Sequence, residues 1–304
     1  MKKNELFPSD AIDLLKRCVC AGQTYLLATS KLIFTCGARP NSAAPGGRDR
    51  LLEYAKRHIP DCRFFMAEKF FEVFQNIQKK DLLSLEDQLA EYCDCIIIVL
   101  ESESAFAELG AFSIKDELAK IILVINDVDH KDSESFISQG PLAKLDKISA
   151  FKPSIFTKPK SILTAATDIS ARLQKIKKTK NTKLPVKNYD EFCKLKPQLR
   201  MFLISDIISL FHPLSHKELI QVFKTLYGEN AFDISIDTSL LIALGLIEKP
   251  HDYYLQCSCN NEKFFGFYGV NEANARAAIV NHYHKYFKNK AIALRDKAYS
   301  KGHV

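Results

Sequence analysis

The stretch CIIIVLESESAFAELGAFS, residues 95–113, decides the fold of this 304-residue chain. Its first six residues form a continuous apolar run, which is typical of a strand buried on both faces of a parallel sheet. The polar residues 101–104 predict a turn, and FAELGAFSIKDELA predicts a helix behind it. Strand, turn and helix in this order indicate one unit of an α/β protein.

The same alternation extends along the chain on both sides of this stretch. KLIFTCG (31–37) predicts a buried strand, the loop RPNSAAPGGR follows it, and RDRLLEYAKRHI predicts a helix. CRFFMAE (62–68) predicts a second strand, FFEVFQNIQKK a helix, and IILVIND a further strand. We therefore expect a doubly wound parallel sheet, whose ligands bind outside the carboxyl ends of the strands.

The second half of the chain has a different pattern. Residues 151–200 are rich in Lys and Pro, which indicates a basic connector. Beyond it, MFLISDIISLFHP and LSHKELIQVFKTLYG predict two helices, and IDTSLLIALGLIEKPHDYYLQ predicts a helix, a turn and a two-stranded hairpin. That order is typical of a winged helix. We expect an α/β domain at 1–150, the connector at 151–200, and a mostly helical winged-helix domain with a last long helix at 201–304.

Composition narrows the class of protein. A content of 47% hydrophobic and 26% charged residues is ordinary for a folded soluble chain. The run CIIIVL is far too short to cross a bilayer, and the start lacks the apolar segment of a signal peptide. An odd number of cysteines, nine, favours reduced thiols and a cytoplasmic location without membrane attachment. We expect no cofactor and no metal, with Cys257, Cys259, His282 and His284 as the one alternative metal set.

Charge is distributed unevenly between the halves. Residues 151–304 contain 24 Lys and Arg against 13 Asp and Glu, a net charge of +11, which leaves −4 for residues 1–150. A basic surface attracts nucleic acids through its summed field and through counterion release. We assign nucleic-acid binding to seven lysines of this half, although a solvated linker would have the same composition: Lys175, Lys177, Lys178, Lys180, Lys183, Lys217 and Lys224.

The turn and helix at 101–113 resemble a motif of the nucleoside deoxyribosyltransferases, in which A-E-L-G opens the helix after a strand. The agreement extends to TCG, CRFFMAE and SLEDQLAEYCDCIII, over about residues 30–145. Together with ELGAFS, SFISQGP (135–141) and the basic half, it resembles more specifically the retron effectors. These join a deoxyribosyltransferase-like domain to a DNA-binding domain.

The resemblance implies a retron antiphage toxin that hydrolyses NAD or a related nucleotide as an N-glycosidase. It also implies that a retron reverse transcriptase and multicopy single-stranded DNA hold the enzyme inactive, within a homo-oligomer or larger nucleoprotein assembly. Metabolic transferases carry an Asp that reads the base where this chain has Ser102, so free nucleoside transfer is disfavoured. A nucleotide-sensing, DNA-binding transcriptional regulator is the alternative from another class.

The resemblance makes Glu108 the catalytic residue, and simple chemistry agrees with it. Breaking an N-glycosidic bond builds positive charge at the anomeric carbon, which a carboxylate can stabilise or capture as an ester. We expect the helix dipole to keep Glu108 ionised and Gly110 to admit a neighbouring backbone. The alternative is that Glu108 is only an acid near a helix N-terminus.

Six further residues flank the expected site, and each has a plain structural alternative. Gly37 permits close backbone approach, the fork of Arg48 suits a phosphate, and Glu68 can hold a ribose hydroxyl. Ser102 and Ser104 offer hydroxyls to a phosphate or sugar, or simply cap the helix. A solvated loop and a helix start are the alternatives for Arg48 and Glu68. We assign substrate binding to Cys36, Gly37, Arg48, Glu68, Ser102 and Ser104.

Overall fold

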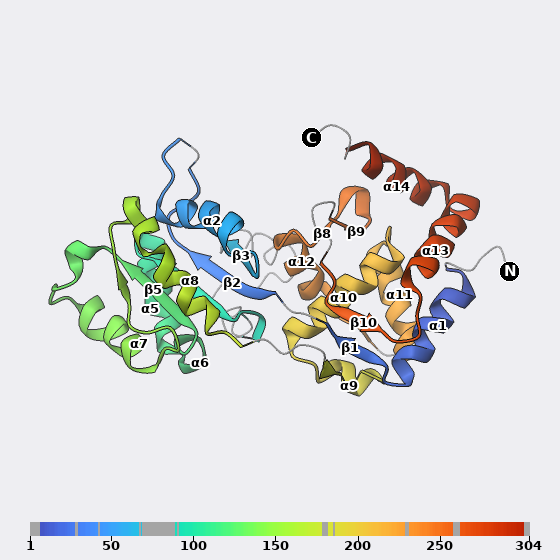
Figure 1. Cartoon of the computed structure of the whole chain (residues 1–304), viewed down its shortest axis with the longest axis horizontal. Coiled ribbons are helices and arrows are strands. Elements are labelled where there is room, and N and C mark those ends of the chain that lie inside the picture. The colour runs from blue at the N-terminus through green and yellow to red at the C-terminus, as the bar shows by residue number, and fades with distance from the viewer. Residues whose placement is uncertain are drawn as a thin grey trace. The chain divides into compact units, whose positions relative to one another are not determined.

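The computed structural model describes residues 7–27, 30–41, 43–66, 68, 89, 91–177, 182–184, 186–228, 231–257 and 262–300 (Figure 1). The chain divides into two compact units. Ser30–Lys178 forms an α/β unit, and Met1–Thr29 joins Thr179–Val304 in a mostly helical unit. The expected helix FFEVFQNIQKK lies outside the described residues.

The α/β unit contains a five-stranded, wholly parallel sheet in the order β3-β2-β4-β5-β6. The chain passes from β2 outward to β3 and then back across to β4, so the strand order reverses between β2 and β4. Such a switch point leaves a crevice at the carboxyl ends of these two strands. The strands are β2 (Lys31–Cys36), β3 (Cys62–Met66), β4 (Cys95–Val99), β5 (Ile122–Asn126) and β6 (Ile155–Phe156).

Helices cover both faces of this sheet, because its strands are apolar on both sides. Ile33, Ile97 and Leu123 pack on one face against α2 (Gly47–His58) and α8 (Ala166–Gln174). On the other face Phe34 meets Phe112 of α5 (Glu103–Ile114), with ring centroids 6.4 Å apart. The doubly wound parallel sheet expected from the apolar runs is thus confirmed.

Shorter helices complete the α/β unit at its edges. They are α6 (Asp116–Ala119), η2 (Val128–His130), η3 (Ser138–Leu142), α7 (Ala143–Ile148) and η4 (Pro159–Ala165).

The unit boundaries differ from the expected ones at 150 and 200. Residues 155–174 do not link two domains but supply β6, η4 and α8 to the α/β unit. Ile162, Ile169 and Leu173 anchor this segment in the same core as β2 and β4. Residues 1–29 instead belong with the helical unit.

The helical unit is built around α10 (Pro197–Phe211), which is buried along most of its length. Phe202 stacks on Phe264 with ring centroids 4.1 Å apart. The buried Asp206 carboxylate accepts the backbone N–H groups of Phe264 and Phe265 at 3.0 and 2.6 Å. Burial outweighs these bonds and raises the pKa of Asp206 to about 8.

Three helices and a hairpin follow one another in this unit, as the sequence predicts. After α10 come α11 (His216–Tyr227), α12 (Ser235–Ala243) and the antiparallel strands β8 (Ile247–Glu248) and β9 (Leu255–Gln256). Gly228 ends α11 with a φ of 101°, the left-handed region that glycine tolerates. The remaining elements are α1 (Ser9–Cys20), β1 (Thr24–Leu26), β7 (Thr182–Lys183), α9 (Tyr189–Cys193), η5 (Pro250–Asp252) and β10 (Phe265–Phe267).

The expected last long helix is in fact two helices. α13 (Glu272–Tyr286) ends at Phe287, and α14 (Lys288–Ser300) starts immediately after it. The buried amine of Lys290 forms an ion pair with Glu218 at 2.8 Å and lies 4.5 Å from the ring centroid of Tyr283. This anchoring holds the first turn of α14 against the unit, and the backbone at Phe287 between the helices is not helical, with φ −131° and ψ 75°.

Within the described ranges, the chain has no helix that combines the length and apolar character needed to cross a membrane.

Candidate active site

Glu108 lies in the second turn of α5, on the side that faces the end of β2. Its carboxyl group lies beside the thiol of Cys36, the last residue of β2, and the two groups shift each other's pKa. Its Oε2 atom is buried and has no hydrogen-bond partner among the described residues. A buried polar atom without a partner is costly, and in native proteins it commonly marks a functional position.

The protonation of Glu108 differs from the sequence expectation. Burial, together with the Glu68 charge, outweighs the lowering effects of Cys36 and Arg48 and raises the pKa of Glu108 from its ordinary value of 4.5 to about 7. The helix dipole does not hold the group ionised, because α5 begins at Glu103 and Glu108 lies beyond its first turn. Glu108 therefore exchanges its proton near neutral pH.

Arg48 forms an ion pair with Glu68 near the carboxyl group of Glu108. Its two terminal nitrogens bind the two Glu68 oxygens at 2.8 Å each, a bidentate pair. Arg48 is only 1% exposed, whereas the Glu68 side chain is 38% exposed. The Arg48 fork thus meets a carboxylate where we expected a phosphate, and its role here is to hold Glu68 at the strand ends.

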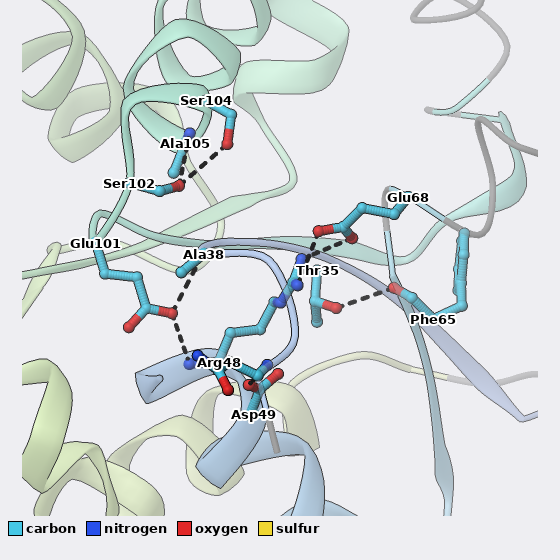
Figure 2. Close-up of polar contacts among 11 residues, drawn as sticks. Thr35, Ala38, Arg48, Asp49, Phe65, Glu68, Glu101, Ser102, Ser104 and Ala105 are labelled. Carbon is cyan, nitrogen blue, oxygen red and sulfur yellow. Dashed lines mark hydrogen bonds and ion pairs between the residues drawn. The ribbon is translucent and has the colours of Figure 1, made fainter. Parts of the chain in front are cut away.

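Glu101 joins the two strand ends at the switch point (Figure 2). Following β4, its carboxylate accepts the backbone N–H groups of Gly47 at 2.5 Å and Arg48 at 2.9 Å, at the start of α2. It also accepts the N–H of Ala38, after β2, at 3.4 Å. A carboxylate at a helix N-terminus is favoured by the unpaired N–H groups and by the helix dipole.

The glycines around Glu101 are required by this close packing. A Cβ atom on Gly46 would lie 3.1 Å from Glu101 oxygens, and one on Gly47 would lie 2.9 Å from the Pro159 carbonyl oxygen. A Cβ on Gly37 would lie 2.9 Å from the Arg48 side chain. Gly110 differs from the expectation, because no described atom lies within 4 Å of the position of its Cβ.

Ser102 and Ser104 lie at the start of α5, where helix capping was the structural alternative to substrate binding. The Ser102 hydroxyl caps α5 by accepting the backbone N–H of Ala105 at 3.3 Å, and it lies 3.1 Å from the Ser104 hydroxyl (Figure 2). Substrate binding by these two hydroxyls stays a prediction.

The carboxyl edge of the sheet thus brings together most of the predicted site residues. These are Cys36, Gly37, Arg48, Glu68 and Glu108. Sequence reasoning missed Glu101, which it treated only as a neighbour of Ser102. The signal that pointed to it was the pair Gly46-Gly47 directly before a helix, since such glycines often allow an anion to approach the helix N-terminus.

The lysines assigned to nucleic-acid binding are divided between the two units. Lys175 and Lys177 follow α8 in the α/β unit and are exposed. Lys183 is exposed on β7, and Lys217 and Lys224 lie seven residues apart on one side of α11, Lys217 exposed and Lys224 partly so. Lys178 and Lys180 lie outside the described residues.

The observed division of the chain reduces the contrast in charge. The helical unit contains 21 Lys and Arg against 15 Asp and Glu, a net charge of +6. The α/β unit contains 22 against 21, a net charge of +1. The basic run at 152–178 accounts for the change, since it belongs to the α/β unit.

The fold and the site define an α/β protein with a buried glutamate at the switch point of a parallel sheet. The profile of the STM3845 retron effector protein family matches residues 45–249, about two thirds of the chain. The chain therefore belongs to this family.

Two curated relatives from Escherichia coli match part of the chain. One is "Retron Ec73 putative ribosyltransferase/DNA-binding protein", 36% identical over 123 residues, which are 39% of either chain. The corresponding Retron Ec86 protein is 33% identical over 118 residues, which are 39% of this chain and 38% of the relative. Each match thus covers about two fifths of the relative's length.

Proposed function

We propose that this retron effector is an antiphage N-glycosidase that hydrolyses NAD or a related nucleotide in the cytoplasm, with Glu108 as its catalytic residue. The observation that carries the proposal is the buried, unpartnered Oε2 atom of Glu108 at the switch point. The names of the E. coli relatives, which describe them as putative ribosyltransferase/DNA-binding proteins, support an enzyme that acts on a ribosyl group rather than a nucleotide-sensing regulator.

The chemistry follows from the position of one carboxylate in a buried site. As the bond between C1′ and the base nitrogen breaks, the electron pair leaves with the base, and positive charge develops on the sugar. Ionised Glu108 stabilises that charge electrostatically or bonds to C1′ as an ester. A water molecule then adds its oxygen to C1′, which in the ester case breaks the bond between C1′ and the Glu108 oxygen. The water loses a proton, for which the free Glu108 carboxylate is a suitable acceptor because its pKa is about 7.

The other predicted residues position this carboxylate or flank it. The Cys36 thiol stays protonated beside Glu108 and favours the ionised form of its carboxyl group. Glu68, held by Arg48 and partly exposed, remains available to a ribose hydroxyl. Glu101 fixes the start of α2, and with it Arg48, against the end of β4.

The helical unit contributes control of this activity. Its α10–α12 helices and the β8–β9 hairpin follow the order of a winged helix, and its net charge of +6 suits a nucleic-acid partner. We infer that a reverse transcriptase and multicopy single-stranded DNA bind the lysines of both units and restrain cleavage within a larger assembly. Loss of this complex during infection would release the enzyme.

The direct test is to incubate the purified full-length protein with NAD and with a panel of nucleosides and nucleotides, and to resolve the products by mass. We expect release of a free base together with the hydrolysed sugar from NAD or from one nucleotide of the panel. If every compound stays intact, with confirmed folding and no inhibiting nucleic acid, the N-glycosidase assignment is wrong.

A further inference from the structure

A cavity lined in part by Glu101 lies at the carboxyl edge of the sheet. Its volume is about 920 Å³, within the range typical of sites for nucleotide-sized ligands. The ends of three strands reach it, through Ala38 after β2, Leu100 after β4 and Asp127 after β5. Arg50 of α2 and Lys160 of η4 complete its wall. We call it the α2–η4 cavity.

The charges of the α2–η4 cavity leave two cations for a ligand. Its two acids are already compensated, since Asp127 pairs with Lys158 at 3.3 Å and Glu101 accepts the N–H groups of α2. Arg50 donates through its Nε to the Pro45 carbonyl at 3.2 Å, and neither Arg50 nor Lys160 has a carboxylate partner among the described residues. Both side chains are exposed, so they can reach an anionic ligand in the cavity.

The rest of the lining is largely apolar and includes flat side chains. The apolar lining comes from Phe106 of α5, Pro45 before α2, Pro159 of η4 and Leu100. Such surfaces suit the face of a nucleobase, whereas the cations suit phosphates. The backbone N–H groups of α2 are taken by Glu101, so side chains must supply the phosphate contacts.

The cavity and the Glu108 site both lie at the end of β2. Cys36, which contacts Glu108, and Ala38, which lines the cavity, are two residues apart, and an extended chain spans about 7 Å over two residues. A substrate with its ribosyl bond at Glu108 can therefore extend into the cavity.

We propose that the α2–η4 cavity binds the nucleoside diphosphate part of a dinucleotide substrate, with Arg50 and Lys160 holding its phosphates. This inference rests on the proposed function and specifies its substrate class: a dinucleotide such as NAD is favoured over a nucleoside, which has no phosphate for these cations.

Calorimetric titration of the full-length Glu108→Gln variant with adenosine diphosphate and with adenosine tests the cavity without turnover. We expect the diphosphate to bind at least about tenfold more tightly than adenosine. Combining Glu108→Gln with Arg50→Ala and Lys160→Ala should weaken diphosphate binding by about tenfold or more and leave adenosine binding unchanged. Lys56→Ala, at the exposed opposite end of α2, is the matched control and should change neither affinity.

Equal affinity for the two compounds, no effect of the Arg50 and Lys160 substitutions, or no binding at millimolar concentration overturns the proposal. Thermal unfolding of each variant checks that the exposed substitutions leave the fold intact. If wild-type protein fails to cleave NAD while the binding results hold, the N-glycosidase assignment fails and the cavity remains a nucleoside diphosphate site.

Discussion

The thiol of Cys36, at the end of β2, lies beside the carboxyl group of Glu108, 72 residues further along the chain on α5. The thiol stays protonated, because burial and the neighbouring carboxylates raise the pKa of Cys36 well above its usual range. This donor is one of two groups that lower the pKa of Glu108. It therefore adjusts the pH at which the carboxylate is ionised.

Replacing Cys36 should shift the pH dependence of cleavage. Since the reaction needs ionised Glu108, activity should fall as the pH decreases through about 7. Cys36→Ala removes a donor that favours the ionised form, so the midpoint of the kcat/KM profile should move to higher pH. Cys36→Ser keeps a donor and should retain a midpoint near that of the wild type. An unshifted profile for Cys36→Ala would contradict this role.

Replacing Glu108 should stabilise the fold, but only at higher pH. The folded protein holds the Glu108 proton up to a pH of about 7, whereas the unfolded chain loses it near 4.5. The contribution of Glu108 to the free energy of unfolding therefore decreases as pH rises between these values. Glu108→Gln should be more stable than the wild type above pH 7, by up to about 3 kcal/mol, and the difference should vanish below pH 4.5.

Urea unfolding of both proteins at pH 4.5 and pH 8 measures this difference in free energy. Because all other titrating groups, including buried Asp206, are common to both proteins, the comparison isolates Glu108. A difference that is the same at both pH values would show that Glu108 has an ordinary pKa.

Two glycine substitutions should have opposite effects on stability. A Cβ on Gly47 would meet the backbone oxygen of Pro159 at 2.9 Å, so Gly47→Ala should lower the free energy of unfolding by about 1–3 kcal/mol. Gly110, inside α5, has open space around its Cβ position within the described structure. Gly110→Ala should raise stability by about 0.5–1 kcal/mol through helix propensity. Equal effects of the two changes would show that the α2 start is not packed as described.

The sheet was predictable from the sequence because each central strand is an apolar run that must be covered on both faces. The contact between Cys36 and Glu108 could not be predicted from the sequence, because it depends on which way two side chains point from elements far apart in the chain. The same holds for Arg48, whose two terminal nitrogens are bound by Glu68. A sequence shows that an arginine can bind a phosphate, but not that a carboxylate is already there.

The misassigned segment at 151–178 contained a local signal that its charge obscured. Ile162, Ile169 and Leu173 recur at helical spacing and are buried, yet the surrounding lysines indicated a connector. The break between α13 and α14 had no comparable signal, because it depends on Lys290 reaching Glu218 and Tyr283.

Neutralising the basic run after α8 should release the proposed restraint. Lys175 and Lys177 are exposed there, and we expect Lys175→Ala, Lys177→Ala, Lys178→Ala and Lys180→Ala together to weaken binding of the nucleoprotein partner. Because counterion release is lost, the salt dependence should become shallower and the loss of affinity should be larger at low salt.

Growth of cells that express this quadruple variant with its reverse transcriptase and DNA partner gives the functional result. We expect toxicity, and normal growth again once Glu108→Gln is added. Normal growth with the quadruple variant alone, at confirmed expression, would show that these lysines do not mediate restraint.

The central claim is that the Glu108 carboxylate promotes cleavage of the N-glycosidic bond. Its most direct test is the rate of base release from NAD by the wild type and by Glu108→Gln, measured by mass at pH 8 with the free energy of unfolding of both proteins determined in parallel. Because the amide keeps the volume but not the negative charge, we predict a loss of at least about 100-fold for a stably folded variant. Release of nicotinamide by Glu108→Gln at the wild-type rate would contradict the assignment.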